Sequence, residues 1–156
     1  MEFKSLQAFI YAAIMVLYIS GCAVGSLPES NAQEKQGETI VEKMTLQIGD
    51  NAFTAALESN DAVDALVEMM NDAPVTIQMS DYSGFEKVGS LGTSLPTDNS
   101  QTTTHAGDIV LYNGNQIVIF YGSNSWSYTR LGTIEDLSGW EDALGSGDVT
   151  VTFSLK

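Results

Sequence analysis

The sequence predicts a mainly β domain, either an antiparallel barrel or a closed sandwich, behind an amino-terminal secretion segment. Roughly seven or eight segments alternate between apolar and polar residues, which is the pattern of half-buried strands. Only two segments repeat at the helical period, and few strand pairs are separated by a helix as a parallel sheet requires. The chain of 156 residues has room for one such domain and an extension.

The composition narrows the classes of function. The 20 Asp and Glu residues outnumber the 6 Lys and Arg residues, which gives a formal net charge of -14. Such a chain repels phosphate backbones, so we expect no nucleic-acid partner. A single cysteine and a single histidine leave no ligand set for zinc, and no calcium-loop spacing occurs. We therefore expect no metal and no cofactor, and we assign no catalytic residue, since serine and histidine occur without a nucleophile elbow.

Residues 1–21 are predicted to be a lipoprotein signal peptide. Lys4 precedes an almost unbroken apolar segment, residues 7–19, which is too short for a comfortable membrane span but suits a signal peptide. The segment leads into Ile19-Ser20-Gly21-Cys22, which resembles the bacterial lipobox, where the cysteine thiol receives a diacylglyceryl group and then becomes the first residue. The alternative is an ordinary signal peptide, or an uncleaved anchor, with an incidental cysteine.

The lipobox predicts where the mature protein lies. Acyl chains on Cys22 give stable anchoring, so we expect the protein in the cell envelope, on the extracytoplasmic face of a membrane that is its partner. Residues 22–42 hold this cysteine and then Ser, Gly, Gln and Glu without an apolar period, which predicts a flexible tether. The folded domain is expected over residues 43–156.

The predicted domain begins with a hairpin and a helix. Residues 44–57 contain two alternating segments around a turn. Apolar residues then recur at i, i+3, i+4 and i+7 over residues 63–70, which predicts a helix of about three turns. Asn60 or Ser59 is its expected N-cap, and the helix ends before Pro74.

The remainder of the domain is predicted to consist mostly of strands. One strand is expected over residues 75–79, followed by a long loop over residues 80–104, where the period is lost. Residues 109–121 then hold two apolar runs on either side of Asn113-Gly114, the strongest short-range signal for a tight hairpin. After this hairpin the pattern predicts a strand over residues 126–134, a short helix over residues 137–144 and a closing strand over residues 149–155, long enough to pair with the first strand.

Strand alternation divides this central hairpin into two faces. We expect a two-residue turn, either Asn113-Gly114 or Gly114-Asn115, and both turns give the same division. The face expected inside the barrel then carries Ile109, Leu111, Val118 and Phe120. The other face carries Asp108, Val110, Tyr112, Ile117, Ile119 and Tyr121, and suits a surface covered by a helix, a loop or a ligand.

A candidate ligand-binding site is expected around this second face. Its candidate residues are Arg130, Tyr128, Tyr121, Asp108, His105 and Trp126. Arg130, the one arginine of the chain, would offer a cationic donor amid aromatic rings, which could hold a carboxylate or a carbonyl-rich peptide. The alternative is that Arg130 pairs with Asp108, Glu135 or Asp136 while the tyrosines pack structurally. His105, the one imidazole, is either a residue of a turn or a base.

Six short motifs lie along residues 43–156. They are Ile48-Gly49-Asp50, Ser94-Leu95-Pro96-Thr97, His105-Ala106-Gly107-Asp108-Ile109, Ile119-Phe120-Tyr121-Gly122, Tyr128-Thr129-Arg130-Leu131-Gly132 and Gly145-Ser146-Gly147-Asp148-Val149. Together they resemble the bacterial cyclophilin-like-fold family of small domains. The resemblance implies a closed antiparallel β-barrel of about eight strands with a short α-helix at each end.

The resemblance also suggests an enzymatic activity to consider. True cyclophilins are peptidyl-prolyl isomerases, which hold the proline ring in an apolar pocket while an arginine donates towards the prolyl nitrogen. Their arginine lies in a Phe-His-Arg-Val context, which this chain lacks, and Arg130 sits on a later strand. No catalytic residue is therefore carried over from the family.

Three hypotheses of function remain open. The first is a monomeric, membrane-tethered and non-catalytic module that binds a small molecule or a peptide on the outer face of the barrel. The second is a divergent prolyl isomerase that uses Arg130, and the third is a structural accessory domain.

Overall fold

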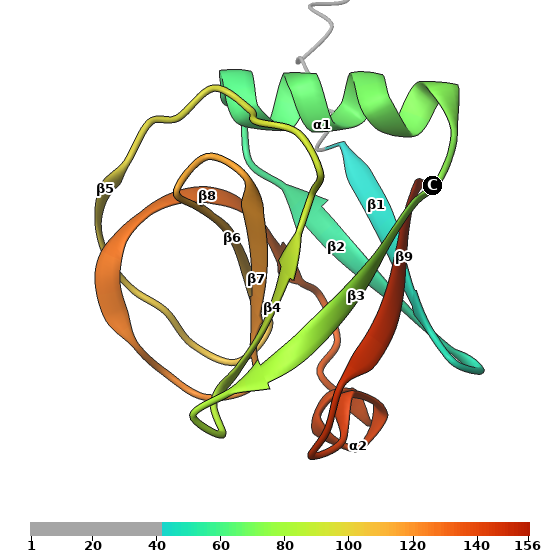
Figure 1. The fold of residues 1–156 in the computed structure, drawn as a ribbon. Coiled ribbons are helices and arrows are strands. Elements are labelled where there is room, and N and C mark those ends of the chain that lie inside the picture. Colours follow the sequence, from blue (N-terminus) through green and yellow to red (C-terminus); the bar gives the residue numbers. More distant parts are fainter. Residues whose placement is uncertain (1–41) are drawn as a thin grey trace, which may run out of the picture. The chain divides into compact units, whose positions relative to one another are not determined.

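The structure is a computed structural model that describes residues 42–156 (Figure 1). The predicted signal peptide, the lipidated Cys22 and nearly all of the tether lie outside the described residues. The elements in chain order are β1 (Lys43–Ile48), β2 (Asn51–Leu57), α1 (Asp61–Asp72), β3 (Val75–Tyr82), β4 (Glu86–Ser90), β5 (Ser100–Thr103), β6 (Asp108–Tyr112), β7 (Gln116–Phe120), β8 (Ser125–Ile134), α2 (Trp140–Leu144) and β9 (Val149–Leu155).

Eight antiparallel strands close into a barrel. Their order is β2-β1-β9-β3-β4-β7-β6-β8, and pairing of β8 with β2 completes the ring. The two closing strands approach so tightly at Gly132 that a Cβ atom there would lie 2.5 Å from the carbonyl oxygen of Ala56. β5 adds to the barrel by pairing with the first half of β8. The predicted fold class is thus confirmed, as is the predicted pairing of the closing strand β9 with the first strand β1.

The two helices lie at opposite ends of the barrel (Figure 1). The side chain of Asn60 accepts a hydrogen bond of 3.0 Å from the Val63 amide and caps α1, whose buried face includes Leu66 and Met70. At the other end, the indole of Trp140 in α2 donates to the carbonyl oxygen of Phe120 at 2.8 Å. Among residues 42–156, no helix has the length and apolar character needed to cross a membrane.

The central hairpin is longer by one residue than the sequence predicts. Tyr112 pairs with Gln116, so three residues form the loop, and Asn113 and Gly114 both adopt left-handed backbone angles. Because side chains alternate with a period of two, the extra residue exchanges the two faces of β7. The prediction that Val118 and Phe120 face the barrel interior, with Ile117 and Ile119 on the other face, is therefore wrong.

The corrected faces give the barrel an apolar layer on each side of this hairpin. The interior core includes Ile109, Leu111, Ile117 and Ile119. A separate outer cluster consists of the buried residues Val110, Val118, Phe120 and Tyr128, with Phe85, Val88 and Tyr112 packed against them. The hairpin is thus buried on both faces, which explains why its sequence reads as two continuous apolar runs.

The segment predicted as a long loop contains two further strands and the end of β3. β4 escapes the pattern because its inward positions are occupied by Lys87 and Gly89 rather than by apolar side chains. Gly89 is required there, since a Cβ atom would lie 2.4 Å from Cγ2 of Ile77. β5 is short and polar, which leaves no apolar alternation to detect.

A polar cluster closes the barrel interior near α2. The fully buried Lys87 ammonium donates to Oδ1 of Asp81 at 2.7 Å and to the carbonyl oxygens of Gly145 and Gly147 at 2.8 Å each. The hydroxyl of Tyr121 donates to the same Asp81 oxygen, and the ammonium lies 5.2 Å from the centre of the Tyr121 ring. Hydrogen bonds from Lys87 and Tyr121 lower the pKa of Asp81. The cluster therefore ties β3 and β4 to the segment between α2 and β9.

Candidate ligand-binding site

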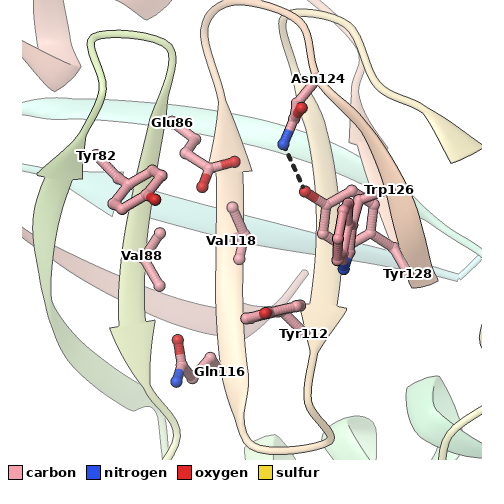
Figure 2. A pocket seen from close by; sticks show the side chains of 9 residues that line it. All are labelled: Tyr82, Glu86, Val88, Tyr112, Gln116, Val118, Asn124, Trp126 and Tyr128. Carbon is pink, nitrogen blue, oxygen red and sulfur yellow. Dashed lines mark hydrogen bonds between the residues drawn. The ribbon is translucent and has the colours of Figure 1, made fainter.

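A pocket of about 400 Å³ opens on the outer face of the barrel, over β4, β7, β6 and the first half of β8 (Figure 2). We call it the outer pocket. Its lining residues are Tyr82, Glu86, Val88, Tyr112, Gln116, Val118, Asn124, Trp126 and Tyr128. Aromatic rings with a few convergent polar groups are the usual composition of a small-molecule site.

The alternation of the strands produces this pocket. Glu86 and Val88 are the outward positions of β4, and they stand beside Val118 of β7, with which Val88 pairs. The floor is closely packed because it belongs to the outer cluster. There the ring of Tyr128 meets those of Phe120 and Tyr112 edge to face, with centroids 5.8 Å and 6.1 Å apart.

A hydrogen bond orients one polar group of the pocket. The side-chain amide of Asn124 donates to the Tyr128 hydroxyl at 3.0 Å. Because this bond uses the hydroxyl oxygen as an acceptor, the hydroxyl hydrogen stays free to donate to a ligand. Burial raises the pKa of Tyr128, so the hydroxyl keeps its hydrogen at neutral pH.

Glu86 is the one charged residue that lines the outer pocket. Only 6% of Glu86 is exposed, and its Oε2 atom has no hydrogen-bond partner among the described residues. Figure 2 shows the carboxyl group turned towards Val118, in the middle of the lining side chains. Burial raises the pKa of Glu86 from 4.5 to about 7. A carboxyl group without a partner in a native structure calls for an explanation, and a ligand in the pocket supplies one.

Two exposed aromatic residues form the rim of the pocket. Tyr82 is 59% exposed and Trp126 is 57% exposed, and the described chain has just one other exposed large apolar residue, Leu137. The ring of Tyr82 rests edge-on against Phe85, with centroids 6.2 Å apart. Gathering of exposed apolar surface at the mouth of one pocket is typical of a binding site.

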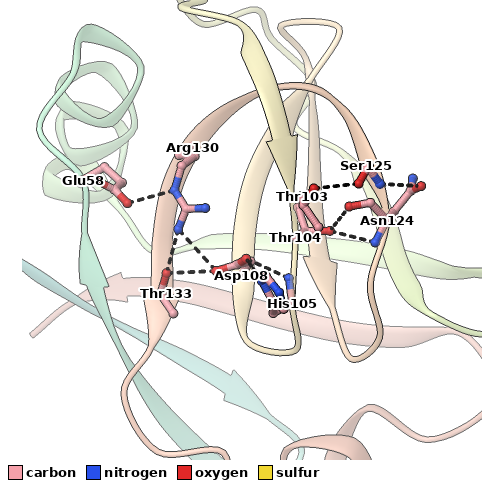
Figure 3. Close-up of polar contacts among 9 residues, drawn as sticks. All are labelled: Glu58, Thr103, Thr104, His105, Asp108, Asn124, Ser125, Arg130 and Thr133. Carbon is pink, nitrogen blue, oxygen red and sulfur yellow. Dashed lines mark hydrogen bonds and ion pairs between the residues drawn. The ribbon is translucent and has the colours of Figure 1, made fainter.

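The sequence-predicted site residues divide between this pocket and two other places. Trp126 and Tyr128 line the outer pocket. Tyr121 belongs to the polar cluster with Asp81 and Lys87, close to α2. Arg130, Asp108 and His105 lie together elsewhere, at the junction of β6 and β8 (Figure 3).

Arg130 is engaged in ion pairs rather than directed into the pocket. Its Nε atom donates to Oε1 of Glu58 at 3.1 Å, and its Nη2 atom donates to Oδ1 of Asp108 at 3.3 Å (Figure 3). Nη2 also donates to the hydroxyl of Thr133 at 3.2 Å. The structural alternative for Arg130 is thus correct in naming Asp108, whereas Glu58 was not foreseen and Glu135 pairs instead with Lys43.

His105 is a residue of a turn at this junction. Its backbone amide donates to Oδ2 of Asp108 at 2.9 Å, while its imidazole is 76% exposed. The side chain of Asp108 is therefore held by Arg130, by Thr133 and by this amide. These contacts explain Asp108 as a structural residue. Within the described part of the chain, no group of three or more His, Cys, Asp and Glu residues could hold a metal ion.

Comparison with known proteins supplies the family. Residues 46–154, most of the described domain, match the cyclophilin-like family. The chain belongs to the cyclophilin-like family. A comparison with curated proteins gives no match. Membership agrees with the closed barrel and its two helices, and the site of this cyclophilin-like barrel has to be argued from its own residues.

Most of the pocket of this cyclophilin-like barrel was missed in the sequence. Tyr82, Glu86 and Val88 fall in the segment predicted as a loop, and Val118 was assigned to the wrong face. No signal of a strand is present at this place, because Glu86 and Val88 share the outer face but differ in polarity, and the inward residue between them is the charged Lys87.

Proposed function

We propose that the protein is a lipid-anchored, extracytoplasmic binding protein whose cyclophilin-like barrel holds a small ligand in the outer pocket without transforming it. The observation that supports this function best is the aromatic pocket with one buried carboxyl group that lacks a partner among the described residues. Buried polar groups without partners destabilise a fold, so they are expected where a ligand completes them.

The contents of the pocket favour binding over prolyl isomerisation. Isomerisation through Arg130 would need its guanidinium beside the prolyl nitrogen of a bound peptide. Arg130 is occupied by Glu58 and Asp108 outside the outer pocket, and no lysine or arginine lines that pocket. A carboxyl group cannot take over this role in its ionised form, because it accepts hydrogen bonds and does not donate them.

The isomerase alternative is tested with a protease-coupled Xaa-Pro assay. We expect no acceleration above the uncatalysed rate for the wild type or for Arg130→Gln. The variant should instead lose about 1 to 2 kcal/mol of unfolding free energy, because the nearly buried carboxyl group of Asp108 loses its cationic hydrogen-bond donor. Acceleration by the wild type that disappears in a folded Arg130→Gln variant would establish the isomerase.

The anchor is tested at Cys22. We expect labelled palmitate to enter the wild type and not Cys22→Ser, because the thiol is the acceptor of the diacylglyceryl group in the proposed lipobox. Label that persists in Cys22→Ser would refute lipidation at this residue.

Ligand binding is tested by thermal shift with a library of small molecules. A ligand present at 100 times its dissociation constant adds about 2.7 kcal/mol to the free energy of unfolding, which is readily detected. Hits that occupy the outer pocket should weaken in Trp126→Ala and Tyr82→Ala but not in Leu137→Ala, which also truncates an exposed apolar side chain. Hits that are equally strong in all three variants would place the ligand elsewhere.

A further inference from the structure

We propose that the ligand of the outer pocket carries an ammonium group, which donates to the Glu86 carboxylate and packs against the surrounding aromatic rings. This inference rests on the proposed binding function and specifies its ligand class. It follows from the charge of the pocket, from the atoms that Glu86 presents and from the rings around it.

The charges of the described chain leave Glu86 without a counter-ion. Each lysine and arginine there is occupied at another place: Lys43 pairs with Glu135, Lys87 with Asp81 inside the barrel, Arg130 with Glu58 and Asp108, and Lys156 donates to Thr54. None of them lines the outer pocket. A protein with a formal net charge of -14 also attracts cations and repels anions at long range. A ligand that matches this pocket is therefore positively charged.

The atoms of the pocket define the kind of cation. Oε2 of Glu86 is an acceptor without a donor among the described residues, so the cation should bear at least one N–H group. The faces of aromatic rings attract organic cations, and Figure 2 shows Tyr82 and Trp126 on either side of the carboxyl group, with Tyr112 farther along the pocket beyond Val118. Val88 and Val118 give apolar surface for the carbon atoms of the ligand. An alkyl or aryl ammonium ion can donate to the carboxylate, pack against the aromatic rings and place its carbon atoms on the two valines.

The neighbours of Glu86 make its protonation the one event that changes the charge of the pocket near neutral pH. The titratable groups that line the outer pocket with it are phenols, namely Tyr82 of β3, Tyr112 of β6 and Tyr128 of β8, whereas Lys87 and Tyr121 lie together in the polar cluster inside the barrel. With a Glu86 pKa of about 7, protons compete with the ammonium ligand. The affinity should therefore rise about tenfold between roughly pH 6 and pH 8.

Three probes of similar shape and different charge test the inference: benzylammonium, benzyl alcohol and benzoate. Each is titrated into the purified full-length protein, and binding is followed by the NMR signal of the Trp126 indole N–H. The indole of Trp140, buried and bonded to Phe120, is an internal control for global effects. We expect benzylammonium to shift the Trp126 signal saturably and to bind about tenfold or more tightly than benzyl alcohol, with benzoate weaker still.

The variant Glu86→Gln completes the test. It should bind benzylammonium no better than benzyl alcohol and should lose the dependence on pH, whereas Leu137→Ala should bind as the wild type does. Benzyl alcohol or benzoate binding as tightly as benzylammonium would overturn the ammonium inference and leave the pocket as a binding site. Absence of any shift at Trp126 with all three probes would overturn the proposed pocket as well.

The ammonium group could belong to a lysine side chain of a peptide or to a small free amine. A blocked lysine, N-acetyl-lysine methylamide, distinguishes these two sources. Binding tighter than that of benzylammonium would support the inference with a lysine side chain of a peptide as the source. Binding weaker than that of benzylammonium would support it with a small free amine.

Discussion

Replacing Lys87 by methionine should lower the free energy of unfolding by about 3 kcal/mol. The side chain of Lys87 is fully buried, and its ammonium is the donor to Asp81 and to the carbonyl oxygens of Gly145 and Gly147. Removing one partner of a buried ion pair costs about 3 to 5 kcal/mol. Asp81 is partly exposed and Gly145 and Gly147 are exposed residues, so water can take over part of the solvation of the acceptors, which places the expected loss at the lower end of that range.

Urea unfolding followed by tryptophan fluorescence measures this effect, and Lys156→Met is the matched control. Lys156 makes one exposed hydrogen bond with Thr54, so its replacement should leave the unfolding midpoint within experimental error. An unchanged midpoint in Lys87→Met would mean that apolar packing substitutes fully for the ion pair. That outcome would contradict the role of the polar cluster in fastening the segment between α2 and β9.

Replacing Glu86 by glutamine should stabilise the protein at alkaline pH. In the folded state the pKa of Glu86 is raised by burial to about 7, whereas the ordinary value is 4.5. Between these values the folded state holds a proton that the unfolded state has released, so stability is lost as the pH rises through 7. The loss between about pH 5 and about pH 8 should be on the order of 2 kcal/mol, and Glu86→Gln should abolish it.

Thermal unfolding at a series of pH values measures this dependence. The difference between Glu86→Gln and the wild type isolates the one group, because the other carboxylates are common to both proteins. Glu68→Gln on the exposed face of α1 is the control and should follow the wild-type curve. A Glu86→Gln curve parallel to that of the wild type would show that Glu86 is already ionised at low pH in the folded state.

Glu86 and Lys87 are adjacent in the sequence and have opposite expected effects on the free energy of unfolding. We expect Lys87 to stabilise the fold from inside the barrel and Glu86 to destabilise it from the outer face at neutral pH. A residue that destabilises the free protein is expected where binding requires it. Glu86→Gln is therefore predicted to gain stability and to lose recognition of the ammonium ligand.

The elements that depend on local sequence patterns were predictable. The opening hairpin, α1 and β9 were predicted because each shows an uninterrupted period and, for α1, a capping residue in Asn60. β4 was missed because Lys87 makes its contacts with Asp81 and with a loop far along the chain. A buried lysine looks like a surface residue until those partners are placed around it.

The outer pocket was less predictable than the barrel. Its lining comes from β3, β4, β6, β7 and β8, so no single segment of sequence contains it. Trp126 and Tyr128 were found because they share one face of a strand, and the face of Val118 depended on a loop whose length the sequence leaves open. The contrast between local and non-local contacts thus separates what was found from what was missed.

The central hairpin divides its residues between two tasks that substitutions can address separately. Ile117 and Ile119 face the interior core, while Val118 between them faces the outer pocket. A combinatorial library that varies Val88, Tyr112 and Val118 would change the shape offered to a ligand and leave the inward side of the sheet untouched. New specificities are therefore accessible on this scaffold without redesign of the barrel.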